Sequence, residues 1–88
     1  MADNQHRHWI LPIYLGGDYR ESNAEWLSPQ DHAEAHRLLW EQHGHIKDYI
    51  TWKSLSVITP EVQKLPMAEQ EVIRRRERDR IKAELGIA

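Results

Sequence analysis

The chain has 88 residues, a formal net charge of −2 and no cysteine. A chain of this length builds one small domain, and small domains often depend on a metal, a disulfide or a partner for stability. Without cysteine, disulfides and thiolate metal sites are excluded, so a bound metal would be held by imidazole or carboxylate groups. The six histidines make imidazole the main candidate ligand.

Neither the hydropathy nor the N-terminal segment indicates a membrane. No stretch approaches the roughly 18 apolar residues of a membrane span. The polar segment Met1 to His6 lacks the apolar core of a signal peptide. We therefore expect a cytoplasmic protein with no membrane partner.

Charge divides the chain into two parts. Residues 1–57 carry five Lys/Arg against eight Asp/Glu, whereas residues 58–88 carry seven against six. The acidic first part counts against tight, nonspecific DNA binding by that part alone, because the DNA backbone is itself anionic.

Two short strands are predicted before the first helix. Residues 8–15 are the most apolar stretch, and their aromatic and β-branched side chains favour a strand. Pro12 either ends this strand or confines it to a sheet edge. Gly16 and Gly17 indicate a turn that opens an irregular loop. Residues 24–27 are predicted to form a second strand, antiparallel to the first.

The rest of the chain is predicted to be helical. Ser28 can cap a helix that begins at Pro29, runs to about His43 and stops at Gly44. Apolar spacing predicts a second helix over residues 46–55. A short helix is expected to start at residues 59–61 and to end before Pro66. The last helix is predicted over residues 67–85, so the fold class is α+β and mostly helical.

The last helix is strongly basic in its middle, where residues 74–80 include no apolar side chain. It can be a solvated helix that carries i,i+4 ion pairs, an arm that contacts phosphates, or a homodimerisation helix. The predicted nucleic-acid-binding arm consists of Arg74, Arg75, Arg76, Arg78 and Arg80.

The helix predicted from Pro29 to about His43 carries a pair of histidines. His32 and His36 are four residues apart, so both imidazoles lie on one face, one turn apart, and can share a metal ion. The pair alone is a weak signal. His8 strengthens it, because a helix packed across the predicted hairpin would bring His8 near the pair. Three imidazoles that leave one position for water or a phosphate oxygen are typical of a catalytic zinc-type site.

The spacing of these residues resembles a known family. Residues 8–17 (HWILPIYLGG), the pair Ser22–Asn23 and residues 27–36 (LSPQDHAEAH) are similar to the small phage-type HNH (His-Asn-His) endonucleases. The resemblance covers residues 7–40, continues weakly into residues 52–56 and leaves the C-terminal third uncovered. It implies a ββα-metal core, a hairpin with a helix packed against it. On this interpretation residues 1–57 form an HNH-like domain and residues 58–88 a charged helical extension.

The resemblance also implies roles for individual residues. His8, His32 and His36 match the family's metal ligands, so the chain is expected to bind one divalent ion, with zinc, nickel, magnesium and manganese as candidates. Asn23 matches the family's catalytic-site asparagine, which pins the loop backbone and orients the general base.

Trp9 departs from the family pattern. It stands where the family places the histidine that takes a proton from the attacking water. An indole offers only an N–H donor near neutral pH, so Trp9 cannot act as this base. Loss of a general base typically costs about 10²–10⁴-fold in rate. A substitute base, either His6 or a metal-bound hydroxide, is the remaining route to cleavage.

Three functions follow as hypotheses. The first is an HNH-like metal-binding protein with impaired or lost DNA cleavage, which acts by binding DNA or a protein partner. That partner could be a host nucleic-acid enzyme, inhibited or regulated in the host cytoplasm by a phage-type protein. The second is an active metal-dependent DNA nicking enzyme that uses a substitute base. The third is a metal-free helical interaction module whose histidines are incidental.

Overall fold

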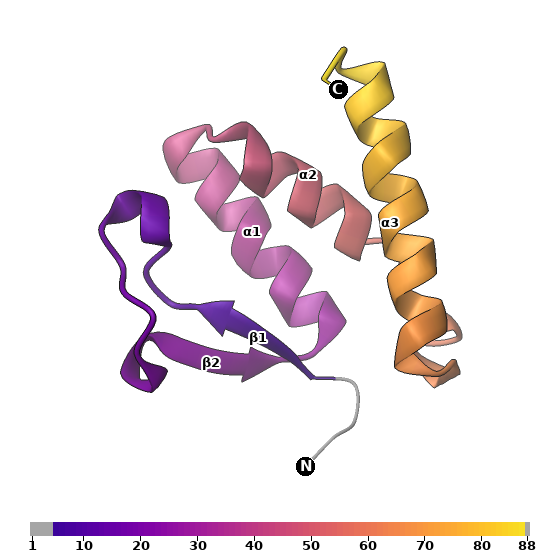
Figure 1. Ribbon diagram of the computed structural model, residues 1–88, viewed down its shortest axis with the longest axis horizontal. Helices are drawn as coiled ribbons and strands as arrows, with labels where there is room; N and C mark the ends of the chain where they lie inside the picture. The colour runs from indigo at the N-terminus through magenta and orange to yellow at the C-terminus, as the bar shows by residue number, and fades with distance from the viewer. Residues whose placement is uncertain (1–4, 88) are drawn as a thin grey trace.

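The computed structural model describes residues 5–87 and combines one antiparallel two-stranded sheet with three α-helices (Figure 1). The fold is therefore α+β and mostly helical, and the hairpin followed by a helix is compatible with a small ββα-like core. Residues 1–4 of the polar N-terminal segment, and Ala88, lie outside the described residues. The elements are β1 (His6–Trp9), β2 (Ala24–Leu27), α1 (Pro29–His43), α2 (Ile46–Leu55) and α3 (Met67–Glu84).

The first strand is shorter than predicted and begins earlier. β1 covers His6–Trp9, not residues 8–15, and pairs with β2 so that His6 lies opposite Leu27 and His8 opposite Glu25. The apolar stretch after Trp9 leaves the sheet, because Pro12 has no N–H to donate to a ladder. One turn of 3-10 helix follows over Ile13–Leu15. The second strand, Ala24–Leu27, is confirmed.

The loop between the strands is held by an asparagine and a glycine. The Asn23 amide donates to the carbonyls of Leu11 and Asp18, each at 2.9 Å, and its Oδ1 accepts from the Leu11 N–H at 2.8 Å. A Cβ at Gly17 would stand 1.8 Å from the Leu11 carbonyl oxygen. Only glycine therefore allows the loop to close on itself at this point.

The caps of α1 are those that the sequence predicts. The Ser28 hydroxyl accepts the N–H of Asp31 at 3.1 Å, and Pro29 occupies the first turn. Gly44 ends the helix in the left-handed conformation, with φ of 68°. These caps fix the rotation and length of α1, and so decide where its histidine face points.

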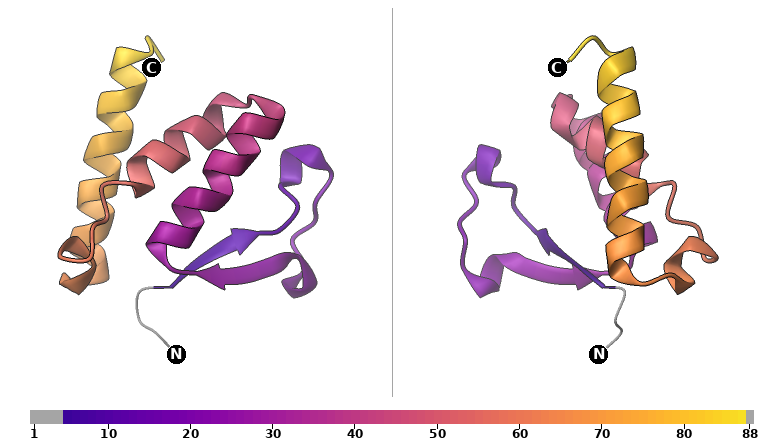
Figure 2. Two further views of the ribbon diagram at one scale, coloured as in Figure 1. Left: turned by 180° about the vertical axis from the view of Figure 1, so that it is seen from behind. Right: turned by 45° about the vertical axis from the view of Figure 1, so that its right-hand side comes forward.

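The helices form a second part of the molecule beside the hairpin. α2 packs on α1, and α3 packs on α2, so α1 and α2 lie between the hairpin loop and α3 (Figures 1 and 2). The buried apolar side chains in the described chain are Ala33, Ile50, Leu55, Ile58 and Ile81.

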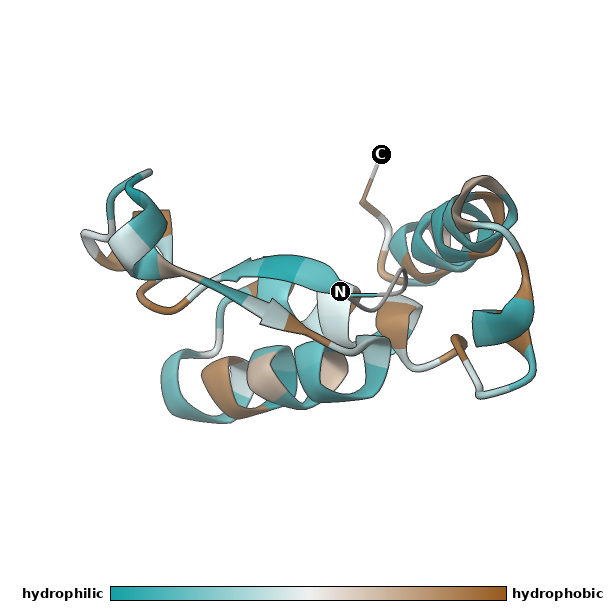
Figure 3. Cartoon of the chain, turned by 90° about the horizontal axis from the view of Figure 1, so that it is seen from below, coloured by the Kyte–Doolittle hydropathy of each residue, from teal (hydrophilic) through white to brown (hydrophobic). Residues whose placement is uncertain are grey.

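The core is small and partly polar. Gln70, rather than an apolar residue, is buried at the start of α3, where its amide donates to the carbonyls of Gln63 and Leu65. Most residues of α3 are hydrophilic (Figure 3). The short helix expected after residues 59–61 is one turn of 3-10 helix at Val62–Lys64.

None of the helices in residues 5–87 is both long and apolar enough to cross a membrane.

Candidate metal centre

Three histidines from the hairpin and α1 meet at one point. His8, His32 and His36 each offer a ring nitrogen, and these nitrogens lie within 4.8 Å of one another. The rings of His8 and His32 are buried and the side chain of His36 is 18% exposed. The three residues that the sequence singled out as ligands are thus brought together, and the group could hold a metal ion.

The spacing of the nitrogens fits a tetrahedral ion. A zinc ion with nitrogen ligands at about 2.0–2.1 Å holds those ligands about 3.3 Å apart. The Nε2 atoms of His32 and His36 are 3.2 Å apart. The His8 ring centre lies 5.3 Å from that of His32 and 5.0 Å from that of His36. Small side-chain adjustments would therefore bring all three nitrogens to one ion.

The other nitrogen of each imidazole has a fixed partner. The Nδ1 of His8 is 3.0 Å from Oε1 of Glu25, which lies opposite it in the hairpin register. The Nδ1 of His36 is 2.8 Å from Oδ1 of Asp48 on α2. When these carboxylates accept Nδ1–H, the lone pair of each neutral ring lies on Nε2, the nitrogen that could ligate a metal ion. Such partners orient ligating imidazoles and raise their basicity toward a metal.

His6 is the partner of the Nδ1 of His32, as Glu25 and Asp48 are the partners of the other two rings. It is buried, and its Nδ1 is 3.2 Å from the Nδ1 of His32. When the Nε2 of His32 faces the common point, its Nδ1–H donates to His6, which then carries its own proton on Nε2. That Nε2 is buried and has no hydrogen-bond partner in the described part of the chain.

A tyrosine extends the partner chain of His36. The Tyr14 hydroxyl donates to Oδ2 of Asp48, whose side chain is almost completely buried. Partial burial of the phenol and its hydrogen bond to Asp48 raise the pKa of Tyr14 to about 12. The tyrosine therefore stays protonated and remains a donor, which holds Asp48 in place for His36.

Burial lowers the pKa values of three of the histidines and so favours their neutral forms. Burial, followed by the neighbouring imidazoles, lowers the pKa of His32 to about 3. Burial is also the main reason that the pKa values of His6 and His36 are lowered, and the positive charge of Arg74 adds to both shifts. Neutral imidazole is the form that ligates a metal ion, so the free protein already holds these rings in the ligating state.

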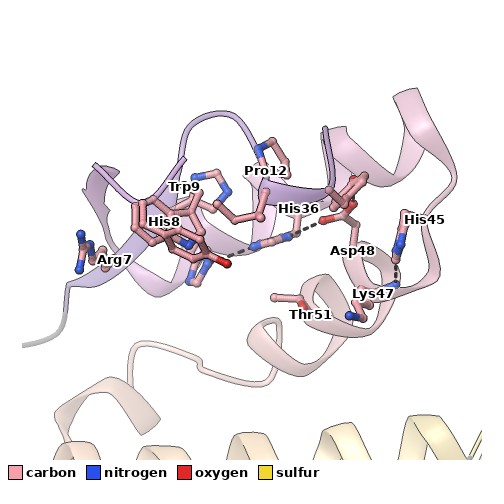
Figure 4. Close-up of a pocket in the computed structure, with 13 residues that line it drawn as sticks. Arg7, His8, Trp9, Pro12, His36, His45, Lys47, Asp48 and Thr51 are labelled. Carbon is pink, nitrogen blue, oxygen red and sulfur yellow. Dashed lines mark hydrogen bonds and ion pairs between the residues drawn. The ribbon is translucent and has the colours of Figure 1, made fainter. Parts of the chain in front are cut away.

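A pocket of about 570 Å³ opens beside the three imidazoles (Figure 4). Its volume is in the range of small-ligand sites. Lys47 and Arg7, whose guanidinium pairs with Glu21 at 2.6 Å, line it together with the aromatic rings of Trp9, Tyr14 and Tyr19. The pocket thus combines a lysine and a large aromatic wall beside the imidazoles.

Trp9 occupies the position where a general base was expected. The Arg7 guanidinium carbon lies 4.7 Å from the centre of the Trp9 ring, and Tyr19 meets the same ring edge to face at 5.6 Å. The indole therefore works as a packing surface in the wall of the pocket.

No other described histidine replaces this base. His6 is buried against His32 and does not line the pocket. His45 does line it, but its Nδ1 accepts the Lys47 N–H at 3.2 Å, so its neutral ring carries the proton on Nε2. Its ring also lies 4.4 Å from that of Tyr14. The sequence analysis assigned no function to His45.

Neither Asn23 nor any of the five predicted arginines lines the pocket, although Arg74 is near enough to the imidazoles to lower the pKa values of His32 and His36. Asn23 pins the loop backbone, which is the positional part of its expected role, and is not among the residues that line the pocket.

On α3, Arg74 and Arg80 form ion pairs with Glu71 and Glu77 three residues before them. Arg80 also pairs with Glu84 four residues after it, so the last helix carries an ion pair at the predicted i,i+4 spacing.

Sequence analysis missed Glu25, Asp48 and Tyr14 as partners of the candidate ligands. Glu25 could have been predicted from the sequence, because the correct hairpin register places it opposite His8. Asp48 and Tyr14 depend on how α2 and the loop pack on α1, for which the sequence carries no local signal.

Comparison of the chain with protein-family models, with curated proteins and with solved structures found no significant match.

Proposed function

We propose that this chain is an HNH-like metal-binding domain that holds one divalent ion through His8, His32 and His36. The observation that carries the proposal is the convergence of the three imidazoles, each with its Nδ1 occupied by a buried or cross-strand partner. A chance cluster of histidines would not be expected to have all three rings oriented in this way.

The donor set favours a zinc-type ion. Imidazole suits zinc, nickel, copper and cobalt, whereas magnesium and manganese prefer oxygen ligands. Among the four ions considered from the sequence, zinc and nickel therefore fit better. Three protein ligands leave a tetrahedral ion one further position, which faces the pocket and suits a phosphate oxygen.

DNA cleavage by this domain is proposed to be impaired. A metal bound here would stabilise negative charge on a phosphate group, but water attack also needs a proton acceptor. Trp9 cannot accept a proton, and neither His6 nor His45 presents a free ring nitrogen to the pocket. The domain is therefore proposed to act by binding a phosphate-bearing ligand, with Lys47 adding positive charge beside it.

Metal binding is tested by calorimetric titration of the wild-type protein with zinc. We expect one ion per chain, loss of binding in His36→Ala and unchanged binding in His43→Ala. His43 is the matched control, because it lies exposed at the end of the same helix. Absence of zinc and nickel binding in the wild type would refute the proposal and favour a metal-free interaction module.

Loss of the base is tested by Trp9→His in a plasmid-nicking assay with added metal. We expect the variant to nick at least about 100-fold faster than the wild type, the lower range of what a general base contributes. A Trp9→Phe variant controls for loss of the indole. If the wild type nicks as fast as Trp9→His, the proposal of impaired cleavage is wrong and a substitute base must operate.

A further inference from the structure

A second cleft lies between α2 and α3. It has a volume of about 160 Å³ and is lined from α2 by Thr51 and Ser54. From α3 it is lined by Glu71 and by three arginines at i, i+1 and i+4 spacing, Arg74, Arg75 and Arg78. The side of the helix that meets α2 thus gathers three of the five arginines that the sequence marked.

The cleft has an excess of positive charge. Arg74 pairs with Glu71 at 2.8 Å, which neutralises one guanidinium. Within residues 5–87 no carboxylate forms an ion pair with Arg75, and Arg78 approaches only the exposed Asp79, at 3.8 Å. Two guanidinium groups therefore remain for an anion, and arginine binds phosphate in a two-pronged geometry.

One donor in the cleft is buried without an acceptor. The Nε of Arg74 is inaccessible to solvent and has no hydrogen-bond partner in the described chain. A buried donor of this kind costs free energy unless an acceptor reaches it. Because solvent does not reach this atom, an anion in the cleft becomes its acceptor only if the Arg74 side chain shifts.

The cleft and the metal pocket share one lining residue on α2. Thr51 lines both, and Asp48, Thr51 and Ser54 follow one another at three-residue spacing along α2. The six-residue step from Asp48 to Ser54 corresponds to a rise of about 9 Å along the helix. A nucleic-acid strand rises by about 3.4 Å per nucleotide, so two to three nucleotides cover this distance. Figure 1 shows α2 running from the hairpin loop side toward the middle of α3.

We propose that the cleft formed by Arg74, Arg75 and Arg78 holds one phosphate of a nucleic-acid strand that places another phosphate, two to three nucleotides away, at the metal centre. This inference rests on the proposed function, because the metal centre supplies the first phosphate position. It assigns the ligand class as an oligonucleotide strand with phosphates two to three nucleotides apart.

Two of the five arginines, Arg76 and Arg80, are excluded from this phosphate site by their surroundings. Arg80 is satisfied by Glu77 and Glu84 on its own helix. Arg76 faces a different hollow, with Val57 and Ile73. The pair Arg76 and Arg80 therefore provides a charge-matched control on the same helix.

The test measures binding of fluorescein-labelled thymidine tetranucleotide, carrying a 5′-phosphate, to the zinc-loaded full chain by fluorescence anisotropy. We expect Arg75→Gln/Arg78→Gln to weaken binding at least about 10-fold. The slope of the logarithm of the binding constant against the logarithm of the salt concentration should fall in magnitude by about 1.4, because two contacts to a single strand are lost. Arg76→Gln/Arg80→Gln should weaken binding less than about threefold.

A shorter ligand separates the two phosphate positions. Thymidine 5′-monophosphate has one phosphate, so its affinity at the metal centre should be the same in the wild type and in Arg75→Gln/Arg78→Gln. Equal losses of tetranucleotide binding in the two double variants would show diffuse charge attraction and overturn the proposal. Binding of an Asp/Glu-rich peptide without tetranucleotide binding would overturn it in favour of a protein ligand.

A zinc titration of the cleft variant keeps the two proposals apart. Zinc binding should be unchanged in Arg75→Gln/Arg78→Gln, because neither residue touches the histidines. Failure of zinc to bind the wild type refutes the proposed function, whereas normal zinc binding without any cleft effect on the tetranucleotide refutes only the second phosphate position.

Discussion

At the scale of single residues, the candidate metal centre depends as much on the partners of the histidines as on the histidines themselves. Asp48 is 3% exposed and receives hydrogen bonds from both His36 and Tyr14. A buried carboxylate with two donors is a fixed acceptor. It therefore holds the His36 ring in the tautomer whose Nε2 can ligate.

Asp48→Asn should weaken zinc binding by about 10–100-fold, the usual effect of losing such a partner. The amide keeps one acceptor oxygen, but its NH₂ group cannot accept the Tyr14 proton. The measurement is competition with a chelator of known zinc affinity. Asp79→Asn, on the exposed side of α3, is the control and should leave the affinity unchanged. Equal affinities in both variants would mean that Asp48 has no influence on the metal centre.

The ligand residues could be predicted from the sequence, whereas their partners could not. The i,i+4 spacing of His32 and His36 places them on one helix face regardless of tertiary structure. The tyrosine that secures Asp48 is 34 residues away along the chain. Contacts over such separations are decided by how elements pack, which local pattern does not encode.

At the scale of elements, α1 is the part of the molecule that the sequence determines most fully. Its first turn is fixed by Ser28 and Pro29, and its end by Gly44. β1 was predicted less well, because hydropathy marked the apolar residues 8–15, while the actual strand, His6–Trp9, buries two histidines instead. A strand whose inward side chains are polar has no hydrophobic alternation to reveal it.

The Ser28 cap offers an element-scale prediction. Ser28→Ala removes the acceptor of the Asp31 N–H and should destabilise the protein by about 1 kcal/mol. Urea unfolding of the metal-free protein measures this difference without a contribution from zinc. Ser28→Asp should retain most of the stability, since aspartate also caps helices. If alanine and aspartate are equally destabilising, the cap is not the cause.

At the scale of the whole molecule, the α+β class and the order of elements agree with the sequence prediction. The predicted boundary between residues 1–57 and 58–88 stays a prediction, and so does a homodimer through α3. α3 packs on α2, and Arg74 is close enough to lower the pKa of His6. The C-terminal helix thus contributes to the environment of the histidine cluster.

Acid should destabilise the metal-free protein. Burial lowers the pKa of His32 from 6.5 to about 3, so between these values the unfolded state binds a proton that the folded state does not. Stability is therefore full above pH 6.5 and falls below it, by about 1.4 kcal/mol per pH unit for this histidine. The lowered pKa values of His6 and His36 act in the same direction.

Urea unfolding of the metal-free protein from pH 7.5 to 4 measures this loss. His32→Gln should flatten the slope by up to one proton, while His43→Gln, at the exposed end of α1, should leave it unchanged. A wild-type stability that does not change between pH 7 and 5 would contradict the neutral state assigned to these buried rings.

The hairpin meets the helices through imidazole rings. Within β1 and β2 the buried side chains are His6 and His8, and both face His32 of α1. Between the helices, apolar side chains such as Leu55 and Ile81 are buried together with the polar Ser54 and Gln70. Because imidazoles bind protons and metal ions, the contact between the hairpin and α1 should depend on pH and metal concentration more than on apolar packing.

Hydrogen exchange should make this difference visible. Without zinc, the paired amides of β1 and β2 should exchange faster than those in the middle of α1, and zinc should slow the strands much more than the helix. The hairpin and the helices would then have separate stabilities against unfolding. The stability of the hairpin would depend on the zinc concentration, whereas that of the helices would change little with it.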